Sequence, residues 1–257
     1  NPTSILNTAS RPHPTPSLDP QFPFLGFLRK IPTMKDHEPN QPIPLKPIGI
    51  ASLLSVVLLW LAQPPAALWP LAMVAIAPLV HLVTLPQPIS RRGYFVVWGA
   101  ALLYWLLSLQ GLRHAHWAMH FCWIALSAYL AAYHLLFLAS ARAMVSRGVP
   151  LFLAVAVAWT GQECLRGYLL TGISACLLGH TLADVPILIQ VADLLGTYGV
   201  SFMIAAVNVG IYRVARSVAL RQSDQGSAPL RGFILDVAGP AVLLGLTILY
   251  GWIQLGH

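Results

Sequence analysis

Apolar residues form seven long runs between residue 48 and the end of the chain, and short polar or proline-containing stretches separate them. Runs of roughly 20 apolar residues with few charges are typical of helices that cross a lipid bilayer. The pattern therefore predicts an all-α integral membrane protein with about seven transmembrane helices. The predicted spans are residues 48–62, 66–85, 93–112, 117–141, 150–170, 194–214 and 233–255.

Prolines divide the chain into two regions. Residues 1–47 hold eleven of the 21 prolines and all three lysines, and they offer little apolar sequence from which a core could form. Such a composition predicts a disordered tail. Gln63-Pro64-Pro65 should stop the first predicted helix, since proline cannot continue it. The domain prediction is thus a tail over 1–47 and a transmembrane helical domain over 48–257.

Composition supports the membrane assignment. Only 9% of the residues are charged, 57% are hydrophobic and the mean hydropathy is +0.69, whereas soluble domains carry about 25% charged residues. The formal charge of +7 does not indicate nucleic-acid binding, because the arginines fall between the apolar runs and form no basic patch.

The arginines also predict an orientation, because cytoplasmic loops of membrane proteins are enriched in Lys and Arg. The loops after the second, fourth and sixth runs, with their edges, hold eight arginines, and the loops on the other side, with their edges, hold two. This asymmetry predicts a cytoplasmic N-terminus and an extracytoplasmic C-terminus. The eight are Arg91, Arg92, Arg142, Arg147, Arg213, Arg216, Arg221 and Arg231, and the two are Arg113 and Arg166.

Most candidate functional residues lie between Trp159 and Asn208. Glu163 and Arg166 are three residues apart near the outer end of the fifth run, so they can pair on one helix face. A lone charge at the bilayer centre costs about 2.5–3.5 kcal/mol on insertion scales. The two residues either hold the helix end against its neighbours or line a polar cavity that opens outward.

The connection over residues 171–193 is long for a compact protein, and such loops are usually functional. It is either an interfacial connector or a re-entrant arm that borders a lipid-substrate site. In the sixth run, Gly196, Gly199 and Gly210 are predicted to allow close helix packing, and Asn208 can bond across helices.

Histidines and cysteines do not predict a metal site. His114, His116, His120 and His134 have no carboxylate or cysteine at a suitable spacing, so we interpret them as interfacial residues. The three cysteines form no CxxC motif, and Cys122 and Cys164 are predicted to pack within apolar runs.

Two motifs in this stretch resemble the membrane domain of the apolipoprotein N-acyltransferase family. The first is W-x-x-x-E-x-L-R-G-x-x-x-T-G, and the second is Q-x-A-x-x-x-G-x-Y-G-V-S-F with a following Asn. The matching residues are Trp159, Glu163, Leu165, Arg166, Gly167, Thr171 and Gly172, then Gln190, Ala192, Gly196, Tyr198, Gly199, Val200, Ser201, Phe202 and Asn208. The chain departs from the family at Ile173-Ser174-Ala175, where Phe-Pro-Trp is common.

The resemblance implies a multi-pass enzyme of the bacterial inner membrane, with its active face extracytoplasmic and no cofactor. Its acyl donor is a phospholipid, and its acceptor is the N-terminal cysteine amine of a diacylated apolipoprotein. The family reacts through a cysteine thioester in an extracytoplasmic nitrilase-like domain with a Glu-Lys-Cys triad.

That triad cannot be assembled from the outer part of this chain, because no lysine follows Lys46. We therefore assign no catalytic residue here, we do not assign Cys176 as the nucleophile, and we expect an inactive fragment that lacks the catalytic domain. The first residue, Asn1 instead of Met, points the same way. The expected substrate-cavity or structural residues are Trp159, Glu163, Arg166, Thr171, Gly172, Gln190, Tyr198, Ser201 and Asn208.

A non-enzymatic multi-span membrane module, such as a scaffold or a small transporter, is the alternative. A transporter should carry polar groups at mid-membrane depth on several spans. Only the fifth and sixth runs are predicted to do so, and only near one end.

Overall fold

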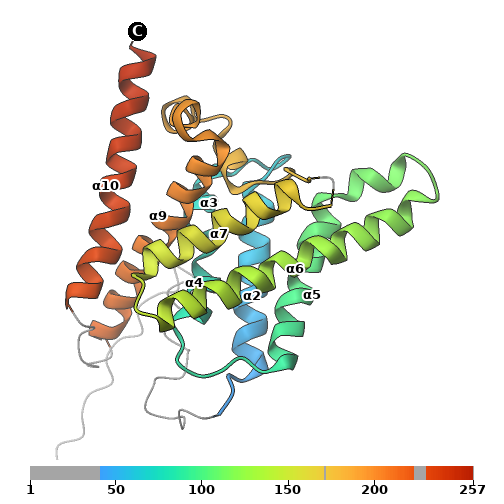
Figure 1. The fold of residues 1–257 in the computed structure, drawn as a ribbon, viewed down its shortest axis with the longest axis horizontal. Helices are drawn as coiled ribbons and strands as arrows, with labels where there is room; N and C mark the ends of the chain where they lie inside the picture. The colour runs from blue at the N-terminus through green and yellow to red at the C-terminus, as the bar shows by residue number, and fades with distance from the viewer. Residues whose placement is uncertain (1–40, 171, 223–229, 257) are drawn as a thin grey trace, which may run out of the picture.

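The computed structural model describes residues 41–170, 172–222 and 230–256, and within these ranges it contains helices and no strand (Figure 1). This agrees with the predicted all-α class. The predicted tail up to residue 40 and the candidate Thr171 lie outside the described residues.

Each of the seven apolar runs is helical in the structure. The first helix begins three residues earlier than predicted, at Leu45. The second run is broken into short pieces near Ile76 and Pro78. The elements are α2 (Leu45–Ala62), η1 (Trp69–Leu71), α3 (Ala72–Ala75), α4 (Ala77–Thr84), α5 (Arg91–Ser108), η2 (Gln110–His114), α6 (Met119–Ser146), α7 (Leu151–Tyr168), η3 (Leu178–Leu182), α8 (Pro186–Ile189), α9 (Ala192–Gln222) and α10 (Leu230–Leu255).

Among the described residues, four helices are long and apolar enough to cross a membrane: α2, α6, α9 and α10. The stretch Trp69–Thr84 is apolar but shorter. The structure thus supports a membrane protein, and the count of seven spans stays a prediction.

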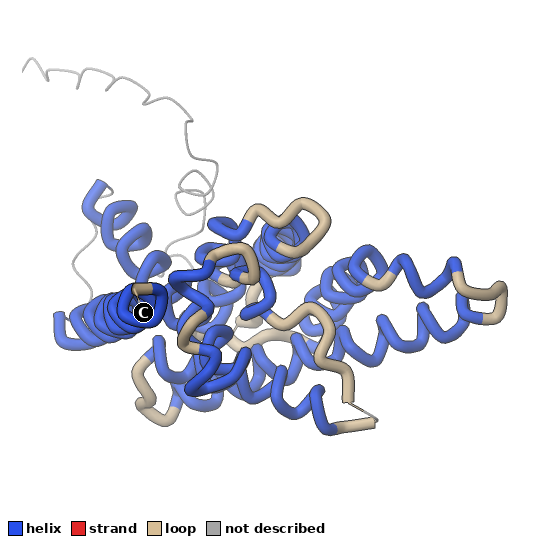
Figure 2. The backbone as a smooth tube through the Cα atoms, turned by 90° about the horizontal axis from the view of Figure 1, so that it is seen from above, coloured by secondary structure: helices blue, strands red, loops and turns tan. Residues whose placement is uncertain are grey.

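Helix α7 lies at the centre of the bundle, where it packs against α6 on one side and α9 on the other. α5 packs between α2 and α6, and α10 packs on α9 at the edge of the molecule. The connection from α5 through η2 to the start of α6 extends away from the bundle in both views (Figure 1, Figure 2). Trp117 and Phe121 at its tip are 72% and 71% exposed, as suits side chains that face lipid or its interface.

Arginines hold one end of the bundle together. The Arg142 guanidinium donates to the carbonyl oxygens of Leu82 and Gln87, which joins α6 to the end of α4. Arg216 donates to the Tyr212 hydroxyl at 3.0 Å and contacts His81 of α4. Arg142 and Arg216, which both belong to the predicted cytoplasmic set, therefore bind to α4 at the same end of the bundle.

Asp236 joins three helices at this end, and the sequence reading did not single it out. Its Oδ1 accepts from the Phe152 amide at 3.0 Å in the first turn of α7, where a carboxylate suits the unpaired N–H groups and the helix dipole. Its Oδ2 forms an ion pair with Arg213 of α9 at 2.7 Å. The presence of one acidic residue in the last apolar run was the sequence feature that could have indicated this role.

Asn208 of α9 bonds to the break in the second run. Its Oδ1 accepts from the Ile76 amide at 2.9 Å, and its Nδ2 donates to the carbonyls of Ala72 at 2.8 Å and Ile204 at 2.9 Å. The side chain is fully buried. It satisfies backbone groups exposed where α3 ends and α4 begins, so its role here is structural.

Candidate functional site

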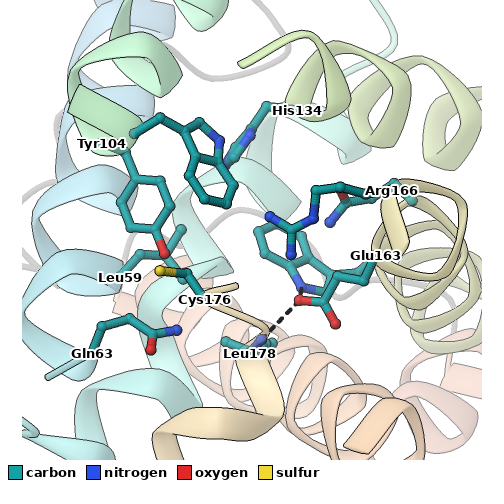
Figure 3. Close-up of a pocket in the computed structure, with 11 residues that line it drawn as sticks. Leu59, Gln63, Tyr104, His134, Glu163, Arg166, Cys176 and Leu178 are labelled. Carbon is teal, nitrogen blue, oxygen red and sulfur yellow. Dashed lines mark hydrogen bonds between the residues drawn. The ribbon is translucent and has the colours of Figure 1, made fainter. Parts of the chain in front are cut away.

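The C-terminal half of α7 contributes one wall of a small buried pocket (Figure 3). Trp159, Gln162, Glu163 and Arg166 lie on this wall, and each is at most 6% exposed. Side chains from α2, α5, α6 and the segment after α7 complete the lining. They are Leu59, Gln63, Tyr104, Trp105, His134, Cys176 and Leu178.

Glu163 links α7 to η3. One carboxylate oxygen, Oε1, accepts from the Trp159 indole N–H at 2.9 Å and from the Leu178 amide at 2.8 Å. The neighbouring amide of Gly179 donates to the Ser201 hydroxyl of α9 at 2.9 Å. Two consecutive amides at the start of η3 are therefore bonded by side chains from two other helices, in the manner of a helix cap.

Arg166 is buried beside Glu163, yet the two residues form no ion pair in the described part of the chain. The Arg166 guanidinium carbon instead lies 4.7 Å from the centre of the Trp105 ring, a cation–π geometry. The two side chains therefore do not pair directly. Both line the pocket, and Glu163 also holds the end of α7 against η3, so the structure leaves both interpretations of the two residues open.

Aromatic rings form the wall opposite α7. His134 lies edge-on to Trp159 at 5.8 Å between ring centres, and Tyr104 packs on Trp105 at 5.1 Å. His134 is only 6% exposed, so its interpretation as an interfacial residue is wrong, whereas His114, His116 and His120 are exposed. A histidine in the middle of an apolar helix, away from its ends, was the signal for burial.

Cys176 closes the pocket from the segment after α7, and Figure 3 shows its sulfur next to the Tyr104 hydroxyl. Burial raises the pKa of the Cys176 thiol, and the charge of Arg166 opposes that shift only in part. Since a thiol with a raised pKa stays protonated near neutral pH, Cys176 is a poor nucleophile. The described residues contain no group of three or more His, Cys, Asp or Glu that could hold a metal ion.

Comparison with known proteins identifies the family of this fold. Residues 55–210 match the family model described as the apolipoprotein N-acyltransferase N-terminal domain. This range includes every residue that lines the pocket.

The chain belongs to the apolipoprotein N-acyltransferase family.

Relatives with this name share most of the chain. The apolipoprotein N-acyltransferase of Rhodopirellula baltica is 44% identical over 216 residues, which cover 79% of this chain and 37% of that protein. The protein from Geobacter metallireducens is 32% identical over 212 residues, 80% of this chain and 40% of its own length. The chain therefore spans about two fifths of the length of these curated relatives.

Four of the residues matched to the family motifs meet around Glu163. They are Trp159, Glu163 and Arg166 of α7, together with Ser201 of α9, which holds the next amide of η3. The Tyr198 hydroxyl packs close to Gly167, where an added Cβ would lie 2.5 Å from it. Gln190 is half-buried between α8 and α9, outside the pocket.

Two glycines of the family motifs have backbone reasons to be glycine. Gly172 has φ +73°, and an added Cβ would lie 2.3 Å from the Gly167 carbonyl oxygen. Gly196 was predicted to serve close packing, but an added Cβ there would meet nothing within 4 Å. Its φ of 66° and ψ of −178° break α9 after one turn, and this conformation is essentially confined to glycine.

Buried polar groups are spread over more helices than the sequence indicated. Ser52 and Ser55 of α2, Ser127 of α6 and Thr247 of α10 are buried as well. The prediction that only two spans carry polar groups is therefore wrong, and the distribution of polar groups does not count against a transporter. Ser55 and Thr247 nevertheless bond to backbone carbonyls of Ala75 and Leu243, which is a packing role.

Gln63, Tyr104, Trp105 and His134 were missed as pocket residues. They come from α5, from α6 and from the residue that follows α2, all distant in sequence from Glu163, and no local pattern connects them. Gln63 holds its position by donating to the Leu177 carbonyl at 3.0 Å.

Proposed function

We propose that this chain is the membrane domain of an enzyme that transfers an acyl chain from a phospholipid to the N-terminal cysteine amine of a diacylated apolipoprotein. The observation that carries the proposal is the match of residues 55–210 to the N-terminal domain of this family. The relatives named apolipoprotein N-acyltransferase support the activity.

The chain's part in that reaction is to bind and position. Apolar side chains exposed along the helices suit acyl chains and lipid, and the polar pocket lies at the outer end of α7. Glu163 and Ser201 hold the segment that lines this pocket through the amides of Leu178 and Gly179. The matched regions cover about two fifths of these relatives, and we place the reacting Glu, Lys and Cys of the family in the part of the enzyme that the match does not cover.

The proposed orientation has seven spans in the bacterial inner membrane, with the N-terminus cytoplasmic and the pocket end extracytoplasmic. The gathering of Arg142, Arg213 and Arg216 at one end of the bundle supports it. Gln63, Cys176 and Leu178 lie at the opposite end, close to the outer leaflet in this orientation.

A chimera tests the proposal. Residues 41–256 of this chain replace the matching part of the Rhodopirellula baltica relative, and the chimera is expressed in bacteria depleted of their own N-acyltransferase. We expect N-acylation of a model lipoprotein, measured by mass spectrometry of its N-terminal peptide. The unaltered relative is the positive control. A chimera that reaches the membrane at the relative's level but leaves the lipoprotein amine free would contradict the proposal and favour a non-enzymatic module.

A further inference from the structure

Unpartnered polar atoms concentrate in the pocket beside α7. Twelve buried side-chain nitrogen and oxygen atoms of the described residues lack a hydrogen-bond partner, and six belong to four residues that line this pocket. The six are Trp105 Nε1, both ring nitrogens of His134, Glu163 Oε2, and Nε and Nη2 of Arg166. A buried polar atom left unpaired destabilises the fold, so a cluster of them at one cavity indicates a polar ligand.

The chemistry of the six atoms restricts that ligand. The Trp105 indole and the Arg166 guanidinium can only donate, whereas ionised Glu163 Oε2 can only accept. The ligand must therefore both accept and donate hydrogen bonds. A halide or a phosphodiester only accepts, and any of these anions, inorganic phosphate included, would add negative charge beside the Glu163 carboxylate.

The size of the pocket further restricts which ligand can bind. The pocket is about as large as one water molecule. Figure 3 shows the Glu163 and Arg166 side chains entering it from adjacent turns of α7. Water is small enough, donates twice and accepts twice, and typically makes about three bonds at such sites.

We propose that this pocket is an internal water site in which an ordered water accepts from Arg166 and donates to Glu163 Oε2. The two charges then form a water-bridged pair. The bridge explains how two oppositely charged residues on one helix face are both buried without direct contact. It also leaves Glu163 Oε1 free to hold the Leu178 amide. This inference does not depend on acyl transfer.

A structure of the whole protein in lipid, at a resolution that shows waters, tests the site directly. We expect density for one water within about 2.7–3.2 Å of both Glu163 Oε2 and an Arg166 nitrogen. Direct contact between the two side chains, or density for a larger ligand, would overturn the proposal.

A double-mutant cycle tests the coupling without any acyl-transfer readout. Glu163→Gln and Arg166→Gln should each lower the Tm in detergent by about 6 °C or more, because each leaves the other charge buried and unbalanced. The double variant should lose about 5 °C less than the two single losses together. If the single variants fail to fold, a folded double variant shows the same coupling.

Asn208→Leu is the control for a loss of buried hydrogen bonds as such. It removes the bonds to Ile76 and Ala72 but touches neither charge. Its loss in Tm should add to that of Arg166→Gln, since the two side chains share no partner. Additive losses for Glu163→Gln and Arg166→Gln would instead overturn the bridged pair.

Discussion

At the scale of single residues, the polar side chains of α9 have separate tasks along one helix. Ser201 holds η3, whereas Asn208, two turns later, bonds to the break between α3 and α4. The sequence marks both as polar residues in an apolar run. It does not reveal their partners, because Ile76 and Ala72 lie more than 130 residues away along the chain.

Replacing Asn208 by Leu should lower the stability of the protein. The change leaves the Ile76 amide and the Ala72 carbonyl unpaired in the core, with an expected loss of about 1–3 kcal/mol. Thermal unfolding in detergent measures it. Ser140→Ala is the control, because this exposed hydroxyl bonds only within its own helix, and it should change little. Equal Tm values for the two variants would contradict the assigned role of Asn208.

At the scale of elements, the connection from α7 to α9 is the part that the sequence predicted least well. Its length indicated a functional loop, but not that Leu178 and Leu182 would be buried in the bundle. A helix-periodic pattern does not predict such a segment, because its conformation depends on hydrogen bonds from Glu163 and Ser201 and on the backbone of Gly196. The long helices were predictable because apolar runs and prolines set their ends locally.

Gly196→Ala should destabilise the break that starts α9. Nothing blocks the added methyl, so the expected loss of about 1–3 kcal/mol comes from the backbone conformation alone. Gly245 is the matched control: it also has nothing within 4 Å of an added Cβ, but it lies inside α10. Gly245→Ala should be neutral or stabilise by about 0.5–1 kcal/mol. Denaturation of both variants in detergent compares them, and equal effects would exclude backbone strain at Gly196.

Thiol labelling tests whether Glu163 holds the segment over the pocket. In detergent, with Cys164 replaced by Ser, exposed Cys122 should react with a maleimide roughly tenfold faster than Cys176, whose thiol is half-buried and has a raised pKa. At a given pH a smaller fraction of Cys176 than of an ordinary thiol is ionised, because its pKa is raised. The labelling rate of Cys176 should therefore still increase with pH where the rate of an ordinary thiol has already reached its plateau.

Glu163→Gln should raise the Cys176 rate toward that of Cys122, because the bond to the Leu178 amide weakens and the segment opens. Mass spectrometry of each labelled cysteine gives the rates, and Ser140→Ala should leave both unchanged. An unchanged Cys176 rate in Glu163→Gln would show that the segment is held by its buried leucines instead.

At the scale of the whole molecule, the two ends of the bundle differ in chemistry. Arginines and Asp236 bind α4, α6, α7, α9 and α10 together at one end. The pocket and the segment that covers it occupy the other. The number of arginines in each loop predicted that arginines would gather at one end of the bundle. The pocket at the other end could not be predicted, because side chains from α2, α5 and α6 meet those of α7 only after folding.

This polarity predicts which loops face which side of the membrane. With the native cysteines replaced by Ser, Ala115→Cys lies in the connection between η2 and α6, and Ser146→Cys lies at the end of α6. Both positions are exposed, and neither change removes an arginine that sets the topology. In intact spheroplasts, a membrane-impermeant maleimide should label Ala115→Cys, whereas Ser146→Cys should react only after permeabilisation. Since α6 joins the two sites, labelling of both in intact cells would mean that α6 does not cross the membrane. The reverse pattern would place the pocket in the cytoplasm, away from extracytoplasmic lipoproteins, and so would contradict the proposed acyl-transfer role.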